Sequence, residues 1–132
     1  MIDTKLLELG DARAVVEAAK KEAAANGWKI SVCVVDAGGH PILYERMDGV
    51  APATARISME KARTAAIFRL ATAIMEDRIP DRLGTMVLPG AAPLKGGVPL
   101  MAAGQVVGAV GISGLAPQQD HQVGEAAAAA LK

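Results

Sequence analysis

The core of this protein must be built almost without aromatic side chains, which limits the architectures open to it. Hydrophobic residues make up 52% of the 132 residues, but Trp28, Tyr44 and Phe68 are the only aromatic ones. The other core-forming residues, chiefly Ala, Val, Leu, Ile and Met, allow helices and a sheet to approach each other closely. A chain of this length forms one hydrophobic core by default, so we expect residues 1–132 to be a single domain.

Hydrophobic spacing switches between helical and strand periods along the chain. Apolar residues recur every three or four positions over residues 4–26, which predicts a helix. Alternating, β-branched runs at 29–36 and 41–47 flank a glycine-containing turn and predict an antiparallel hairpin. The remaining expected segments are helices at 53–70 and on to Met75, a loop at 80–97, a hairpin of 98–103 with 106–113, and a helix from Pro117. This order predicts an α+β fold, with helices packed on one antiparallel sheet.

Charge and composition narrow the classes of partner. Fourteen basic and fourteen acidic residues give a formal net charge of zero, which disfavours nucleic acid as the main partner. No apolar run approaches the roughly 18 residues of a membrane span, and residues 1–5 lack the pattern of a signal peptide. Cys33, the single cysteine, has no partner for an internal disulfide. We therefore expect a cytoplasmic protein that binds neither nucleic acid nor membranes.

One stripe of the expected helix at 53–70 combines an amine and hydroxyls with large apolar groups. At about 100° per residue, this stripe contains Thr54, Ile57, Lys61, Thr64 and Phe68. Such a surface suits the wall of a pocket for an anionic or amphipathic ligand. The alternative is that Lys61 extends from an ordinary surface stripe, with its amine in water.

Three glycine-containing segments are further candidates. The turn before His40 either presents an imidazole ligand or is only a hairpin turn. The run Lys95-Gly96-Gly97 either offers backbone N–H groups to an anion or only lets the chain enter a strand. The run from Gly108 to Gly114 leads into a helix and either binds a polar group or clears space for helix-on-sheet packing.

Taken together, these segments resemble the GlcG/HbpS family. The resemblance rests on Val32-Cys33-Val34-Val35-Asp36-Ala37-Gly38-Gly39-His40, Arg46-Met47-Asp48-Gly49, Lys61-Ala62-Arg63-Thr64-Ala65, Gly96-Gly97-Val98-Pro99-Leu100, Val107-Gly108-Ala109-Val110-Gly111-Ile112-Ser113-Gly114 and Gln119-Asp120. The C-terminal domain of PduO-type proteins is similar too. The resemblance implies a profilin-like or roadblock-like α+β domain, with a central antiparallel sheet of about five strands flanked by helices. It also implies homo-oligomers, from dimers to octamers, and haem binding by some members.

The resemblance implies a small-molecule-binding protein, accessory to a catabolic or cofactor pathway, whose ligand is haem, another tetrapyrrole or a small organic acid. The expected ligand-binding residues are His40, Asp48, Lys61, Thr64, Gly96, Gly97, Ser113, Gly114 and Asp120. We expect the pocket between the helix of Lys61 and the second hairpin, with apolar walls from Met47, Phe68 and Met101. If haem binds, His40 or His121 is the expected iron ligand, and no other metal site is expected. The alternative is a small enzyme acting on an oxo-acid, in which Lys61, beside Asp36 or Asp48, serves as an acid–base or Schiff-base residue.

Overall fold

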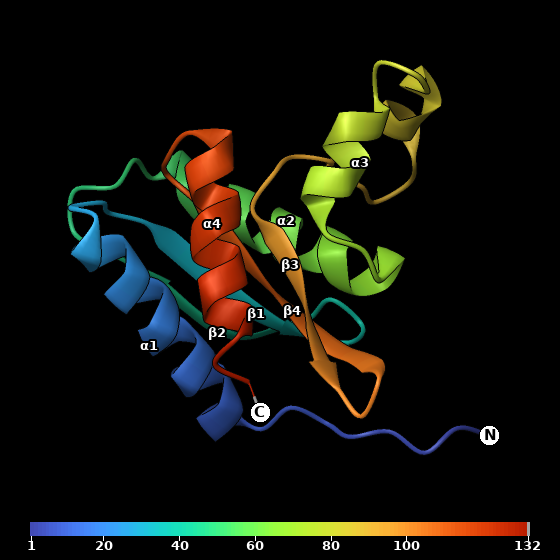
Figure 1. Ribbon diagram of the computed structural model, residues 1–132, viewed down its shortest axis with the longest axis horizontal. Helices are drawn as coiled ribbons and strands as arrows, with labels where there is room; N and C mark the ends of the chain where they lie inside the picture. The colour runs from blue at the N-terminus through green and yellow to red at the C-terminus, as the bar shows by residue number, and fades with distance from the viewer. Residues whose placement is uncertain (132) are drawn as a thin grey trace.

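The computed structural model describes residues 1–131 and shows four α-helices, a short 3₁₀ helix and four strands (Figure 1). In chain order these are α1 (Leu9–Ala25), β1 (Ser31–Asp36), β2 (Pro41–Arg46), α2 (Ala53–Phe68), α3 (Thr72–Arg78), η1 (Leu83–Val87), β3 (Gly97–Ala102), β4 (Gln105–Ser113) and α4 (Pro117–Ala128). The order of helices and hairpins expected from the sequence is confirmed.

The four strands form one antiparallel sheet in the order β2-β1-β4-β3. Each hairpin supplies two neighbouring strands, and the hairpins join through β1 and β4, which pair from Ser31 opposite Ser113 to Asp36 opposite Gly108. The α+β fold with a central antiparallel sheet is therefore confirmed, with four strands rather than about five.

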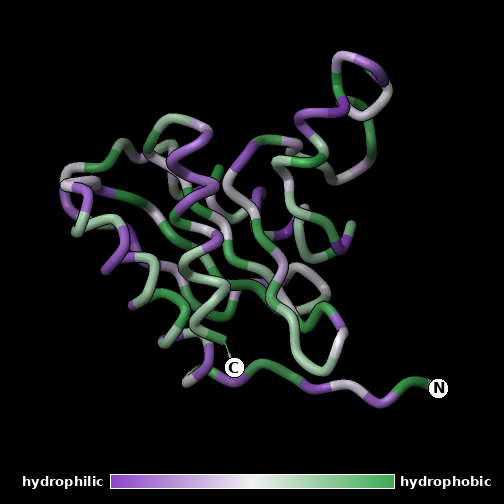
Figure 2. The backbone as a smooth tube through the Cα atoms, viewed as in Figure 1, coloured by the Kyte–Doolittle hydropathy of each residue, from purple (hydrophilic) through white to green (hydrophobic). Residues whose placement is uncertain are grey.

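Helices cover both faces of the sheet. Helices α1 and α4 lie on one face and α2 lies on the other, across β1, β4 and β3 (Figure 1). Successive side chains of β1 point to opposite faces of the sheet and so contribute to the hydrophobic core on each face. Val32 and Val34 face α1 and α4, whereas Cys33 and Val35 face α2. Figure 2 shows hydrophilic and hydrophobic positions alternating along α1, as expected for a helix with one buried face.

Helix α2 packs directly on the backbone of the sheet at two glycines. A Cβ atom on Gly111 would overlap the carbonyl oxygen of Ser58 and lie 2.6 Å from the amide nitrogen of Ala62. A Cβ atom on Gly97 would overlap the carbonyl oxygen of Lys61 in the same way. The side of α2 that meets the sheet is built from Ala62, Ala65 and Ala66. Small residues on both sides explain how the core closes without aromatic side chains.

The first helix begins later than its hydrophobic spacing predicts, at Leu9 rather than residue 4. Glu8 is in an extended conformation and its N–H donates to Asp11 Oδ2 at 2.8 Å, so the helix starts directly after this residue. The residues before it run along the sheet instead: Leu7 lies over Gly108, and Gln105 Nε2 donates to the Asp3 carbonyl oxygen at 3.1 Å. Tertiary contacts therefore override the local helical pattern in this segment.

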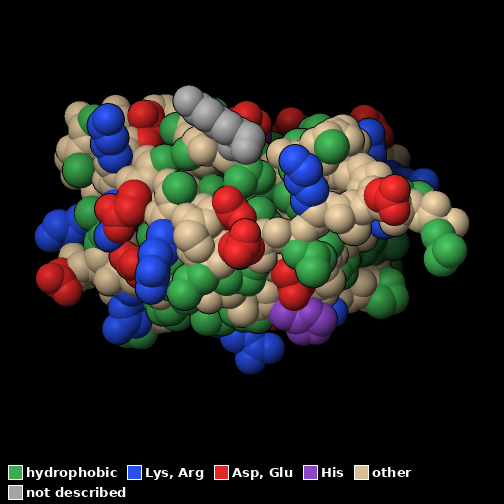
Figure 3. All heavy atoms as spheres, turned by 90° about the horizontal axis from the view of Figure 1, so that it is seen from below, with side chains coloured by type: hydrophobic (Ala, Val, Ile, Leu, Met, Phe, Trp, Pro, Cys, Tyr) green, Lys and Arg blue, Asp and Glu red, His purple; other side chains and the backbone are tan. Residues whose placement is uncertain are grey.

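The surface mixes charges of both signs. On the face shown in Figure 3, basic and acidic side chains are interspersed with apolar ones. Within residues 1–131, no helix has the length and hydropathy needed to cross a lipid bilayer.

Candidate functional site

Lys61 lies in the middle of α2 and is buried, with 4% of its surface exposed. Its Nζ donates to the Ile112 carbonyl oxygen at 2.9 Å and to Asp120 Oδ2 at 3.0 Å. Asp120, in the first turn of α4, is 3% exposed and its Oδ1 accepts from the N–H of Leu115 at 3.1 Å. This buried ion pair therefore ties α2 to the end of β4 and to the start of α4.

Gly96 covers this ion pair with its backbone. Its φ is +129°, and a Cβ atom there would lie 3.0 Å from Lys61 Nζ and 3.1 Å from the Asp120 Cβ. Burial raises the pKa of the Asp120 carboxyl above its ordinary value, although the Lys61 ammonium and the Leu115 N–H act in the opposite direction. The Lys61 amine thus has two acceptors within the protein, the Ile112 carbonyl oxygen and the Asp120 carboxylate, without any ligand.

Two threonines hold the segment that leads into β3. Thr64 Oγ1 accepts from the N–H of Ala92 at 2.8 Å, and Thr72 Oγ1 accepts from the N–H of Gly97 at 2.9 Å. Both threonines are fully buried. Of the sequence-predicted residues, Lys61, Gly96 and Asp120 thus form or cover the buried ion pair, whereas Thr64 and Gly97 take part in the hydrogen bonds that hold the segment before β3.

Ser113 ends β4 opposite Ser31, and Gly114 follows it with a φ of +126°. Ser113 is buried, whereas Gly114 is exposed. Beside this strand end, the hydroxyl groups of Ser31 and Thr54 lie 2.7 Å apart. Lys61 reaches the same end of β4 only through the backbone of Ile112.

The turn between β1 and β2 holds Asp36 and His40 at the opposite end of β1. Asp36 Oδ1 accepts from the N–H groups of Gly38 and His40, both at 2.9 Å, and lies 3.3 Å from His40 Nδ1. Partial burial raises the pKa of Asp36, but the two N–H groups outweigh it and leave the pKa below its ordinary value. The His40 side chain is 81% exposed.

Within residues 1–131, the side chains of Asp48 and His121 form no hydrogen bond or ion pair with either group, although His121 follows Asp120 in the chain. Asp48 is exposed, in the turn after β2. His121, on α4, lies with Nε2 3.3 Å from Glu125 Oε1, and its buried Nδ1 has no hydrogen-bond partner within residues 1–131. Within the described chain, Lys61 forms no hydrogen bond or ion pair with Asp48, His40 or Asp36. Asp36 and Asp48 are the residues expected to act with Lys61 in the enzyme hypothesis.

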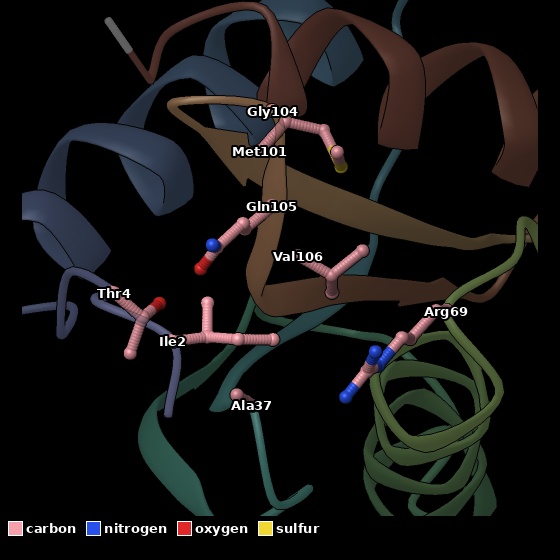
Figure 4. Close-up of a pocket in the computed structure, with 8 residues that line it drawn as sticks. All are labelled: Ile2, Thr4, Ala37, Arg69, Met101, Gly104, Gln105 and Val106. Carbon is pink, nitrogen blue, oxygen red and sulfur yellow. The ribbon is translucent and has the colours of Figure 1, made fainter.

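A cavity of about 370 Å³ lies between the second hairpin and the C-terminal end of α2 (Figure 4). It is lined by Ile2, Thr4, Ala37, Arg69, Met101, Gly104, Gln105 and Val106. We refer to it as the Arg69 cavity. The sequence predicts a pocket between this helix and this hairpin, and the cavity there is lined by Arg69 and not by Lys61.

Arg69 is the one charged residue lining this cavity. It ends α2 in the left-handed conformation, with φ 54° and ψ 42°, which is uncommon for a residue other than glycine. Figure 4 shows its guanidinium group pointing into the space between Val106, Ile2 and Ala37. Within residues 1–131, Arg69 forms no ion pair. Sequence reasoning missed Arg69 because no glycine or asparagine marks this helix end.

The model of the haem-degrading HbpS-like family matches residues 7–129 of the chain. The chain belongs to the HbpS-like family. Protein GlcG of Escherichia coli K12 is 46% identical over 103 residues, which cover 77% of each chain.

Solved structures of the family share the fold. A double mutant of HbpS from Streptomyces reticuli is 30% identical with a TM-score of 0.91, covering 100% of this chain and 91% of that one. A complex of PduOC with haem is 26% identical with a TM-score of 0.87, covering 97% and 96%.

Neither His40 nor His121 lines any of five cavities of about 300–440 Å³ formed by the described residues. Within residues 1–131, no three His, Cys, Asp or Glu side chains gather closely enough to hold a metal ion. Two of these cavities place arginine beside apolar side chains with no acidic residue in the lining, an arrangement that suits a carboxylate.

Proposed function

We propose that this HbpS-like protein binds a small molecule bearing a carboxylate, with Arg69 as its anchor. The observation that carries the proposal is the guanidinium group in the Arg69 cavity, which forms no ion pair with any described residue and faces apolar walls. Guanidinium binds carboxylate through two parallel N–H···O bonds, and Arg69 is exposed, so an anion can reach it from solvent.

A small organic acid suits the Arg69 cavity better than a tetrapyrrole. The cavity volume of about 370 Å³ lies near the lower end of the roughly 300–1,000 Å³ typical of ligand pockets. Ile2, Ala37 and Val106 provide a short apolar surface, and Gln105 provides an amide. These groups match a compact acid with one further polar substituent, the class to which hydroxy- and oxo-acids belong.

Haem is the second candidate ligand, because the PduOC structure similar to this one is a haem complex. A haem held by His40 would lie at the exposed β1–β2 turn, and one held by His121 would lie against α4. Neither histidine lines the Arg69 cavity, although Ala37 of the same turn as His40 does, so variants of Arg69 and of the two histidines distinguish the two candidates.

Calorimetric titration of the whole chain with a panel of small hydroxy- and oxo-acids tests the first candidate. We expect Arg69→Gln to weaken binding roughly tenfold or more, because hydrogen bonds to charged groups contribute strongly. Arg13→Gln, at an exposed position on α1, is the matched control and should bind like the wild type. Equal affinity of Arg69→Gln and wild type would refute the assignment of the site.

Titration with haemin tests the second candidate. A Soret band that persists through gel filtration and disappears in His40→Ala or His121→Ala would support haem binding through that residue. No spectral change on titration would exclude it.

A further inference from the structure

A second groove lies on the other side of the same helix end. Helix α2 ends at Phe68, and the next residue, Arg69, lines the Arg69 cavity. The two neighbours of Arg69 in the chain, Phe68 and Leu70, line the second groove, which has a volume of about 310 Å³. Its lining residues are Phe68, Leu70, Met75, Arg78, Arg82, Gly84, Thr85 and Leu88. We refer to it as the Arg78–Arg82 groove. It is formed by the end of α2, by α3 and by η1, and Figure 1 shows α3 and the following loop standing out from the body of the molecule.

The groove is lined by two positively charged residues and by no acidic residue. Arg78 and Arg82 lie one helical turn apart, since the Arg82 N–H donates to the Arg78 carbonyl oxygen at 2.9 Å. Within residues 1–131, neither guanidinium group forms an ion pair or a side-chain hydrogen bond, and no acidic residue lines the groove. The nearby carboxylate of Asp77 is already paired with Lys95 at 3.2 Å. Two guanidinium groups on one small groove, with no acid among its walls, favour an anionic occupant.

Thr85 supplies an independent indication. It is 7% exposed and lines the groove, yet its hydroxyl group forms no hydrogen bond with any residue in the described part of the chain. The hydroxyl oxygen is accessible from the groove, because it is not among the buried polar atoms that lack a partner. A ligand oxygen in the groove could therefore take the place of water at this hydroxyl group.

The other walls define the body of the ligand. Phe68, Met75 and Leu88 present a ring, a thioether and a branched aliphatic chain. A fully hydrated inorganic anion would leave these apolar surfaces unused, whereas a compact apolar body would cover them.

We propose that the Arg78–Arg82 groove binds an organic anion with a carboxylate on a compact aromatic or branched aliphatic body. The two guanidinium groups and the Thr85 hydroxyl hold the carboxylate, and the apolar walls hold the body. This site is independent of the Arg69 cavity and of the function proposed for it, because no residue lines both.

The test is a titration of the ¹⁵N-labelled whole chain with benzoate, followed by amide chemical shifts. We expect saturable shifts among residues 75–88, with benzamide (which lacks the charge) and acetate (which lacks the body) each binding roughly tenfold or more weakly. In the double variant Arg78→Gln/Arg82→Gln the benzoate affinity should fall by a similar factor. Both arginines are exposed, so the variant should retain its fold. Thr85→Val, which keeps the shape, should weaken benzoate several-fold.

The controls separate the two sites. Arg69→Gln and Arg13→Gln should leave the shifts of residues 75–88 unchanged. Shifts confined to residues 37 and 104–106 that vanish in Arg69→Gln would overturn the second site and leave the first intact. Benzoate binding with equal affinity to the double variant, or benzamide binding as tightly as benzoate, would also overturn the proposal.

Discussion

The buried ion pair between Lys61 and Asp120 makes the sharpest prediction for stability. We expect Lys61→Met to lower the free energy of unfolding by about 3–5 kcal/mol, the range for removing one partner of a buried pair. The physical reason is that Asp120, 3% exposed, would keep only the Leu115 N–H at 3.1 Å as a donor. The carbonyl oxygen of Ile112 would also lose the donor it has at 2.9 Å.

Urea unfolding measured by circular dichroism gives this quantity, with Lys20→Met as the matched control. Lys20 pairs with Glu17 at 2.8 Å and Glu45 at 2.7 Å, but near the surface, where such pairs contribute about 0–1 kcal/mol. The double variant Lys61→Met/Asp120→Leu should be more stable than Lys61→Met alone, because it buries no unpaired charge. A Lys61→Met loss no larger than that of Lys20→Met, or strictly additive losses in the double variant, would refute the reasoning.

The same variant should respond to pH in a defined direction. Burial already raises the pKa of Asp120 in the wild type, and loss of the Lys61 ammonium removes the main influence that lowers it. A carboxyl whose pKa is higher in the folded state than in the unfolded state favours folding when protonated, so its penalty grows as pH rises between those two values. The stability gap between Lys61→Met and wild type should therefore narrow as the pH falls from 7 towards 4. A difference in unfolding free energy between Lys61→Met and wild type that does not change with pH would contradict this role of Asp120.

Three further outcomes follow from the packing and the contacts. Gly111→Ala should lower the free energy of unfolding, measured by thermal unfolding, by about 1–3 kcal/mol. The reason is that the new methyl group would meet the backbone of α2 rather than a movable side chain. Unchanged stability would show that α2 can shift. Cys33 is fully buried and burial raises the pKa of its thiol to about 12, so an aromatic disulfide reagent at pH 8 should label it only after unfolding; rapid labelling of the native protein would contradict its burial. Borohydride with an oxo-acid should leave Lys61 unmodified in the native protein, and a mass adduct there would favour the enzyme hypothesis.

Local sequence signals predicted the fold because each element carries its own start and stop. The switch from helical spacing to alternation, the Asp36–Gly39 turn and Pro117 at the first turn of α4 each act over a few residues. Where the prediction failed, at the first helical residue, the deciding contacts of Leu7 and Asp3 are with Gly108 and Gln105, about a hundred positions further along the chain. Such contacts leave no trace in the local pattern.

The candidate site was harder to predict for the same reason. The stripe of α2 that carries Lys61 gave no indication that Asp120, 59 residues away, lies 3.0 Å from its amine. Arg69 was missed because its left-handed conformation is imposed by the helix end and by Leu70, whose N–H donates to the Ala65 carbonyl oxygen at 3.2 Å. Arg78 and Arg82 were not predicted because the local sequence there indicates only the end of a helix and a loop.

The residues that look most like a ligand site in this sequence are those whose polar groups already have partners in the fold. Lys61, Thr64 and Asp120 all form hydrogen bonds within the chain, and the glycines near them let backbone approach backbone. A ligand is bound most strongly where donors lack such partners, because there it replaces only water. Around the C-terminal end of α2, Arg69, Arg78 and Arg82 are such donors within residues 1–131. The buried contacts therefore fix the middle of that helix to the sheet, and the chemistry we propose lies at its C-terminal end.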